Sequence, residues 1–251
     1  VQTITSGDAF EAPTIISKTA GATRRNESTT STDASDVKFG NKRIGVNWLD
    51  AVIPSSQQAI DDIAGLESML ARFAADDFAI TEGAEVLNGT GVGQARGLMT
   101  YAAGDIAQVV SGSSTTFTTG GLLALVGALK TAYLAGSSFI ANRATIFTHL
   151  FGLQDQDKRH YLVPDFRNGF QFTLLGFPLV EMPNMPDVAG NALPLAFGNF
   201  KRAYTWVERK QLSLFVDPYT ARPFTKYIWS KRSGGDVVVK EAIKIQKIAA
   251  A

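Results

Sequence analysis

The sequence predicts an α+β fold. Three observations support this prediction: a long segment in the first half has helical periodicity, the C-terminal quarter alternates as β-strands do, and no regular strand–helix–strand repeat connects them. A chain of 251 residues can form one large domain or two interleaved ones. With 45% hydrophobic residues and no apolar run near the length of a membrane helix, the composition is that of a globular chain without a membrane span.

The N-terminal part divides into two segments of different character. Residues 1–16 alternate apolar and polar side chains, and Pro13 limits their pairing, so we expect an edge strand. Residues 17–43 are polar and nearly empty of large apolar side chains, so they cannot bury a core of their own. They form either a solvated flexible loop or an extended loop supported by another surface. Its basic residues are Lys18, Arg24, Arg25, Lys38, Lys42 and Arg43.

A strand over Ile44–Ile53 is expected to lead into a long helix. Ser55 is placed to cap that helix, and Gln58 follows three positions later, as in a capping box. Gly65 is expected to bend or break it. The part from Gly65 to Leu87 should be roughly 33 Å long at the usual helical rise. The apolar positions expected to share one face are Ile60, Ile63, Leu66, Met69, Leu70, Phe73, Ile80, Ala84 and Leu87.

The glycine-rich stretch LNGTGVGQARGL closes this helix. A phosphate-binding glycine loop normally follows a strand and opens a helix, so this order argues against a nucleotide enzyme. Asn88 and Gly89 are expected to adopt the left-handed conformation that ends helices. A small-molecule enzyme or binding protein that uses the Gly89–Gly97 turn remains an alternative.

The remaining segments mix both kinds of element. Within residues 101–210 we expect short strands and helices, and within 211–251 an antiparallel meander with turns at Asp217–Tyr219 and Ser233–Asp236. The expected central elements are strands at Ile106–Val110, Phe139–Ile140, Phe170–Leu175 and Leu179–Val180, and helices at Gly120–Ala135 and Ala144–Leu153. The expected C-terminal strands are Leu212–Val216, Thr225–Lys231 and Val237–Ile248.

Catalytic and metal-binding patterns are missing from the sequence. There are two histidines, His149 and His160, no cysteine, no G-x-S-x-G elbow and no Walker A sequence. Adjacent carboxylates such as Asp76 and Asp77 face different directions on a helix and are expected to be solvated. We therefore expect no catalytic, cofactor or metal site, and no enzyme.

The phrases EGAEVLNGTGVGQARGL, QDQDKRHYLVP, LLGFPLVEMPNMPDV, AFGNFKRAY and DPYT, in this order, resemble those of major capsid proteins of tailed bacteriophages, which have the Hong Kong 97-type fold. The resemblance implies a remnant of an N-terminal arm at 1–16, an extended loop at 17–43 and a peripheral domain with the spine helix at 44–100. It further implies a mixed α+β central domain at 101–210 and return strands to the antiparallel sheet of the peripheral domain at 211–251.

The function implied is that of a shell subunit which self-assembles into hexamers and pentamers of an icosahedral head around double-stranded DNA. Its partners would be other copies of itself, neighbouring capsomers and the packaged DNA, with scaffold, protease, portal or decoration proteins as further candidates, and no membrane. The subunit would assemble in the host bacterial cytoplasm and reside in the virion. The six basic residues of the extended loop are the candidate subunit contacts. An encapsulin-like nanocompartment, which shares the fold but holds protein cargo, is the nearest alternative.

Overall fold

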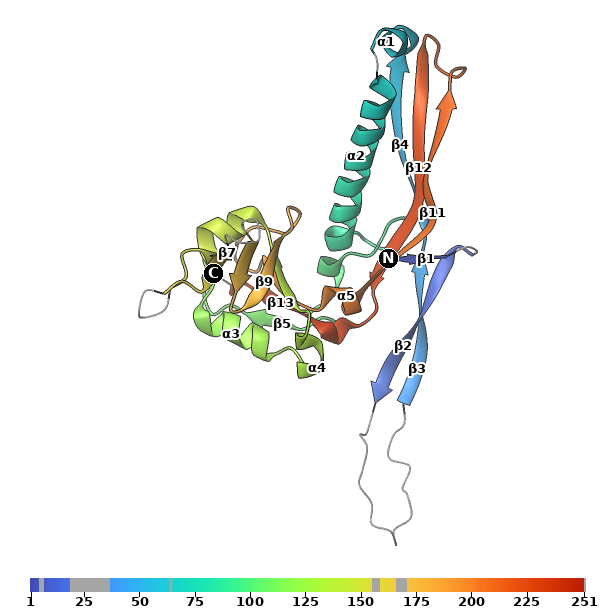
Figure 1. The fold of residues 1–251 in the computed structure, drawn as a ribbon. Coiled ribbons are helices and arrows are strands. Elements are labelled where there is room, and N and C mark those ends of the chain that lie inside the picture. The colour runs from blue at the N-terminus through green and yellow to red at the C-terminus, as the bar shows by residue number, and fades with distance from the viewer. Residues whose placement is uncertain (5–6, 19–36, 64, 155–158, 166–170, 251) are drawn as a thin grey trace.

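The computed structural model describes the chain except for residues 5–6, 19–36, 64, 155–158, 166–170 and 251. Figure 1 shows three parts: a long slab of sheet and helix, a body of mixed helices and strands at its side, and a two-stranded hairpin that extends away from one end of the slab. The N-terminus lies near the place where the three parts meet, and the C-terminus lies in the body. The predicted α+β fold is confirmed.

The slab contains a four-stranded sheet in the order β1 (Gln2–Thr3), β11 (Tyr204–Asp217), β12 (Phe224–Val237) and β4 (Asn47–Ser56). The two 14-residue strands β11 and β12 are antiparallel, β4 pairs antiparallel with β12, and β1 pairs parallel with β11. The chain therefore builds one sheet from three widely separated segments.

Two helices follow β4. A short helix α1 (Gln57–Asp62) precedes the 23-residue helix α2 (Leu66–Asn88), and Gly65 separates them with a left-handed φ of 85°, so the predicted break is confirmed. The cap of α1 is Ser56, whose hydroxyl accepts a hydrogen bond from the amide of Ala59, and not the predicted Ser55. Ser55 still belongs to β4 and pairs with Thr225 of β12, because β4 ends at Ser56, three residues beyond the expected end at Ile53.

One face of α2 packs against the sheet. Leu66, Leu70, Ala74 and Phe78 are buried there in a cluster with aromatic side chains of β12. These positions repeat every four residues, so they form a narrower stripe than the sequence suggested. Met69, Phe73 and Ile80 were assigned to the same face, but they lie on the flank of the helix and are 45%, 52% and 67% exposed.

The hairpin consists of β2 (Ala9–Lys18) and β3 (Val37–Gly45), which pair antiparallel. Residues from Ala9 onward, expected to belong to an N-terminal edge strand, thus form one side of the hairpin. At its base, Ala12 and Ile44 are buried with Val46 and Val207 of the slab.

The body is organised around a seven-stranded mixed sheet. Its strands, in spatial order, are β5 (Gln108–Val110), β13 (Ile243–Lys247), β10 (Leu195–Gly198), β6 (Ser138–Ala141), β9 (Phe177–Glu181), β8 (Gln171–Leu174) and β7 (Leu162–Asp165). The pairs β5–β13 and β6–β9 are parallel and the others antiparallel. Phe139 and Phe197 are fully buried at the centre of one core cluster, with ring centroids 4.4 Å apart.

Short helical segments complete this part of the chain. They are η1 (Leu98–Thr100), α3 (Thr119–Gly127), α4 (Thr131–Leu134), the π-helical turn η2 (Thr145–Leu150), α5 (Phe200–Ala203) and η3 (Lys240–Ala242). The predicted helix over Gly120–Ala135 is therefore two helices. Along the parts of the chain described, none of these helices has the length and apolarity to cross a membrane.

The predicted C-terminal meander is wrong in two respects. Strand β12 continues through Ser233–Asp236, where a turn was expected. Its two glycines do not reverse the chain; they leave room for the backbone of Gly45 and the ring of Tyr204 to approach the strand closely. The last strand, β13, pairs with β10 and β5 of the body, not with the slab. Its side chains Ile243 and Ile245 are buried in a core cluster of the body, so the apolar alternation reflects burial there. The assignment of all of 211–251 to the peripheral domain is corrected accordingly.

Candidate assembly interface

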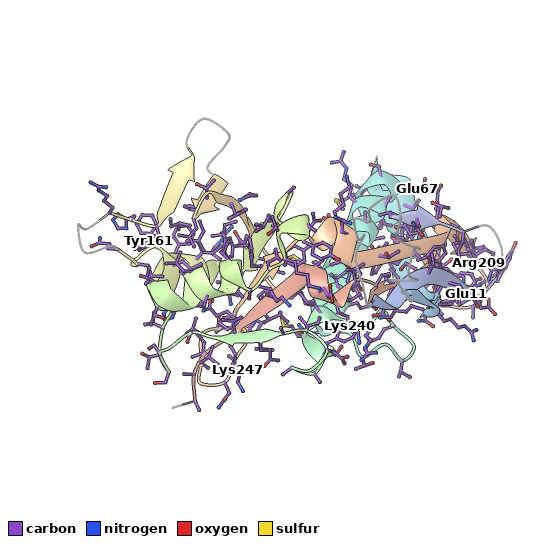
Figure 2. All side chains as sticks on the ribbon, turned by 90° about the horizontal axis from the view of Figure 1, so that it is seen from below. Glu11, Glu67, Tyr161, Arg209, Lys240 and Lys247 are labelled. Atoms are coloured by element: carbon purple, nitrogen blue, oxygen red, sulfur yellow. The ribbon has the colours of Figure 1, made fainter. Side chains whose placement is uncertain are left out.

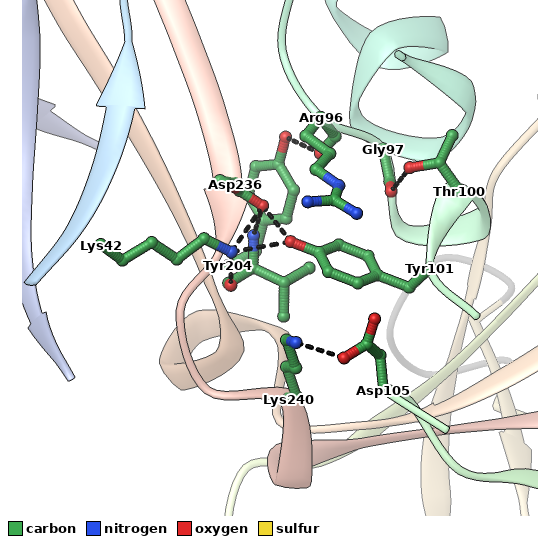
Figure 3. Close-up of polar contacts among 10 residues, drawn as sticks. Lys42, Arg96, Gly97, Thr100, Tyr101, Asp105, Tyr204, Asp236 and Lys240 are labelled. Atoms are coloured by element: carbon green, nitrogen blue, oxygen red, sulfur yellow. Dashed lines mark hydrogen bonds and ion pairs between the residues drawn. The ribbon is translucent and has the colours of Figure 1, made fainter. Parts of the chain in front are cut away.

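The base of the hairpin is attached to the rest of the molecule through Lys42 of β3. Its ammonium nitrogen lies 2.9 Å from Oδ1 of Asp236 and donates hydrogen bonds to the carbonyl of Val237 at 2.6 Å and to the hydroxyl of Tyr101 at 2.7 Å. Figure 3 shows these groups converging from the hairpin, from the end of β12 and from the segment after η1. The side chains of Lys42 and Asp236 are only 20% and 11% exposed, so water screens this ion pair less than a surface pair.

Tyr101 links this ion pair to the body. Its hydroxyl donates a hydrogen bond to the carboxylate of Asp236, and the guanidinium of Arg96 lies 4.1 Å from the centre of its ring. Lys240, which forms an ion pair with Asp105, lies 5.4 Å from the same ring. Figure 2 shows Lys240 between the slab end of the molecule, marked by Arg209, and the far end of the body, marked by Tyr161.

Burial sets the protonation behaviour of this cluster. It lowers the pKa of Lys42, although the hydrogen bond and charge of Asp236 oppose that shift. Burial also raises the pKa of Tyr101, and the hydrogen bond to Asp236 acts in the same direction, so the phenol stays protonated. The hydrogen bond from Lys240 lowers the pKa of Asp105. The cluster is a neutral phenol among ionised groups, which suits anchoring rather than proton transfer.

Two glycines at the end of β12 let three segments meet beside Asp236. A Cβ on Gly234 would lie 2.0 Å from the carbonyl oxygen of Gly45, and one on Gly235 would lie 2.5 Å from the hydroxyl of Tyr204. The carbonyl of Gly235 accepts a hydrogen bond from the amide of Arg96 at 2.8 Å. The glycines therefore bring β12, the hairpin base and the turn after α2 into direct contact.

The glycine-rich turn after α2 packs against its own chain. Gly89, expected to be left-handed, is extended with φ −61° and ψ 140°, and a Cβ there would lie 2.2 Å from the carbonyl oxygen of Ala95. A Cβ on Gly97 would lie 2.4 Å from the carbonyl oxygen of Leu87. The left-handed residues are Gly91 and Gly93. Packing within the chain thus explains the glycines at both ends of the turn. The small-molecule alternative, which rested on this turn as a binding loop, therefore loses its support.

A second ionic cluster fixes α2 to the sheet. Nζ of Lys231 in β12 lies 2.8 Å from a carboxylate oxygen of Glu82 in α2 and 2.8 Å from one of Glu208 in β11. Burial alone would lower the pKa of Lys231, but the hydrogen bonds and charges of the two carboxylates outweigh it and raise the pKa. This cluster holds the helix in one position along the slab.

Comparison with known proteins decides what kind of molecule this is. Residues 1–248 match the family model described as "Phage capsid family". The chain belongs to the phage capsid family. It is thus a shell subunit, found in the capsid of the virion, and the family and fold are those of structural proteins rather than enzymes. Among curated protein sequences, none matches the chain significantly.

Solved capsids have the same fold as this subunit. The structure described as "Capsid of empty GTA particle computed with C5 symmetry" superimposes with a TM-score of 0.87 at 30% identity, covering 99% of this chain and 88% of that one. The structure described as "Gordonia phage Cozz" gives a TM-score of 0.67 at 17% identity, covering 100% of this chain and 85% of that one. The SrpI encapsulin of Synechococcus elongatus gives 0.72 at 14% identity, covering 98% and 84%. The last two show the shared fold alone.

The six candidate interface residues of the capsid subunit fall into different positions. Lys42 faces inward and is bound within its own chain, whereas Arg43, the next residue, is exposed. Lys18 and Lys38 lie at the far end of the β2–β3 pairing, where Lys18 is opposite Val37. Arg24 and Arg25 lie outside the described residues. No contact with a second copy tests these residues, so their role in the interface stays a prediction.

Sequence reasoning missed the groups that anchor the hairpin. The sequence assigned Asp236 to a turn and gave Tyr101 and Arg96 no role. Both residues are far from Asp236 in the sequence, by 135 and 140 positions, and Arg96 lies in a glycine turn that matches no known binding motif. The available signal was the glycine pair Gly234 and Gly235 directly before an acidic residue, because adjacent glycines within an apolar strand indicate close approach of another segment.

Proposed function

We propose that this capsid subunit assembles into hexamers and pentamers that close into an icosahedral head around double-stranded DNA. The observation that carries the proposal is the family match over residues 1–248 together with 30% identity to a particle capsid over nearly the whole chain. Closed shells need the same surfaces to be reused around symmetry axes, which an elongated subunit with a projecting hairpin provides. Assembly takes place in the host bacterial cytoplasm, with scaffold, protease, portal or decoration proteins as candidate helpers.

The hairpin is the proposed clasp between subunits. Three features support this role. Strands β2 and β3 extend away from both the slab and the body, and a two-stranded hairpin alone is marginally stable in water. The strands and the segment between them also carry all six basic candidate residues, four in the strands and two, Arg24 and Arg25, between them. Because Lys42 is bound within its own chain, the proposed contact set is Lys18, Arg24, Arg25, Lys38 and Arg43. Their charges would select partner and register more than they would add affinity.

An encapsulin-like shell is the second candidate, because an encapsulin shares the fold. At 14% identity that likeness concerns the fold alone, whereas the family model matched is that of phage capsids. The cargo separates the two. A DNA-containing shell supports the phage-type head, and a shell loaded with protein and free of nucleic acid supports the nanocompartment.

Electron microscopy of the protein expressed from its natural start codon, together with any neighbouring protease, tests the proposal. We expect uniform closed shells, and nuclease-protected DNA when the packaging components are present. Changing Arg24, Arg25 and Lys38 to Glu should weaken assembly while the subunit stays folded by circular dichroism. The matched control exchanges Lys and Arg at these three positions and keeps every charge. Monomers that persist under all assembly conditions would refute the proposed shell function. Normal shells from the charge-reversed variant would refute the proposed role of the hairpin as a clasp.

A further inference from the structure

We propose that Lys42 is a positioning residue: it fixes the direction in which the hairpin leaves the subunit, so that a neighbouring copy meets the hairpin in a single orientation. This inference rests on the proposed clasping role of the hairpin and adds to it the group that controls the geometry of the clasp. Lys42 acts through Asp236, Tyr101 and the carbonyl of Val237, and it does so without touching the neighbour itself.

The hairpin needs such an anchor because little apolar contact holds it. The fully buried cluster at its base consists of Ala12, Ile44, Val46 and Val207, of which two lie on the hairpin, and the partly buried Phe10 of β2 packs against it. A cluster this small can hold the hairpin against the slab without defining its angle. Beyond the base, the two strands pair with each other, and Figure 1 shows them leaving the slab and the body.

The contacts of Lys42 define an angle because they use all of its donors. A lysine ammonium has three N–H groups, and here three acceptors lie 2.6–2.9 Å away: the hydroxyl of Tyr101, the carbonyl of Val237 and the carboxylate of Asp236. The acceptors come from two segments that are far apart in the sequence, the one after η1 and the end of β12. Any rotation of the hairpin about its base would break at least one of these hydrogen bonds.

The acceptors are themselves fixed. The hydroxyl of Tyr101 donates to the carboxylate of Asp236, and the backbone amide of Val237 donates to Oδ1 of the same carboxylate at 2.7 Å. The guanidinium of Arg96 covers the ring of Tyr101 at 4.1 Å. The ammonium thus binds to a rigid set of groups at the junction of slab, body and glycine turn, which couples the hairpin to all three.

The next residue on β3 supplies a matched control. Arg43 has the same charge and stands one position along the strand, but its side chain is exposed and forms no ion pair with any described residue. Replacing Lys42 with Met keeps most of the side-chain stem and removes the ammonium, whereas Arg43→Met removes a charge from the outer face. A difference between the two variants therefore reports on the anchoring contacts and not on net charge.

The chain contains no cysteine, so spin labels can be placed at chosen sites only. With Asn41→Cys on the hairpin and Ala75→Cys on α2, both exposed, double electron–electron resonance on the unassembled subunit measures the hairpin direction. We expect one narrow distance distribution for the parent and for Arg43→Met. We expect a broad distribution for Lys42→Met, and shells of mixed size or low yield from the same variant without labels.

Each outcome decides the inference. A narrow distance distribution in Lys42→Met would overturn the inference. A broad distance distribution together with normal shells from the same variant would overturn it as well. If Lys42→Met does not fold, Asp236→Asn, which keeps the shape of its side chain, tests the same contact with the same two measurements. Absence of shells from the parent protein would refute the proposed function, while the distance distribution would still show whether Lys42 holds the hairpin. The two failures are therefore distinguishable.

Discussion

Replacing Lys231 with Met should destabilise the subunit by about 2–3 kcal/mol, between the cost of losing an exposed ion pair and that of breaking a buried one. The lysine side chain is 15% exposed, and those of Glu82 and Glu208 are 19% and 22% exposed. The variant leaves both carboxylates near one another without their shared cation. Methionine retains the apolar stem, so packing contributes little to the loss.

Urea unfolding of the unassembled subunit, followed by tryptophan fluorescence, measures this loss, because Trp229 is buried under α2. Lys226→Met in the same strand is the control, since Lys226 forms no ion pair with a described residue, and it should change the free energy of unfolding by less than about 0.5 kcal/mol. Adding Glu82→Gln to Lys231→Met should recover part of the loss, because one unpaired carboxylate is removed. Equal costs for Lys231→Met and Lys226→Met would refute the reasoning.

The pH dependence of this contribution has a definite sign. The pKa of Lys231 is raised in the folded protein, so its stabilisation is fully present below the unfolded value of about 10.4 and is lost as the pH rises through the higher folded value. The parent and Lys231→Met should therefore converge in stability at strongly alkaline pH. Unfolding curves recorded at increasing pH check this convergence.

Three further changes have separate physical causes. Phe139→Ala removes a fully buried ring and should lower the free energy of unfolding by about 3–5 kcal/mol in urea titration. Gly234→Ala places a Cβ 2.0 Å from the carbonyl oxygen of Gly45, so thermal denaturation should show a loss above about 4 kcal/mol or no folded protein at all. The hydrogen bond from Arg232 lowers the pKa of Asp8, so the ionised carboxylate stabilises the fold and this stabilisation is lost as the pH falls through the lowered pKa. Asp8→Asn should therefore make the free energy of unfolding depend less on pH below about pH 4.

Controls for these changes lie elsewhere in the chain. Gly127→Ala lies at the end of α3, with nothing within 4 Å of a new Cβ, and should be neutral or slightly stabilising. Asp62→Asn, an exposed carboxylate without a described ion pair, should leave the acid profile unchanged. A mild effect of Gly234→Ala would mean that β12 and the hairpin base can separate at low cost, which would contradict the tight junction inferred at Asp236.

The features that depend on local sequence were predictable. The helix of residues 66–88, the break at Gly65 and the pairing of β11 with β12 follow from helical periodicity, a glycine within it and strand alternation, which neighbouring residues determine. The destination of β13 was not predictable in this way. An apolar alternating segment indicates that one face is buried, but it does not say which of two sheets buries it, and here tertiary contacts with β10 and β5 decide.

The hairpin base illustrates the same limit for the candidate interface. Lys42 and Arg43 are adjacent basic residues in a polar segment, and the sequence alone does not distinguish their roles. Strand geometry sends them to opposite faces, and only the position of Asp236, nearly two hundred residues later in the chain, makes one an internal anchor. Sequence patterns can thus propose the charged segment but cannot divide its residues between internal and external contacts.

The slab is long compared with the junction beside Gly234 and Gly235, so a small rotation at the junction becomes a large displacement at the far end. The slab extends from this junction over at least the length of α2, which is roughly 34 Å for 23 residues. A rotation of about 5° at the junction would move the far end of the slab by about 3 Å at that length. The close packing at these two glycines therefore determines where the far end of the slab lies, and a small change in that packing would displace every contact that the far end makes.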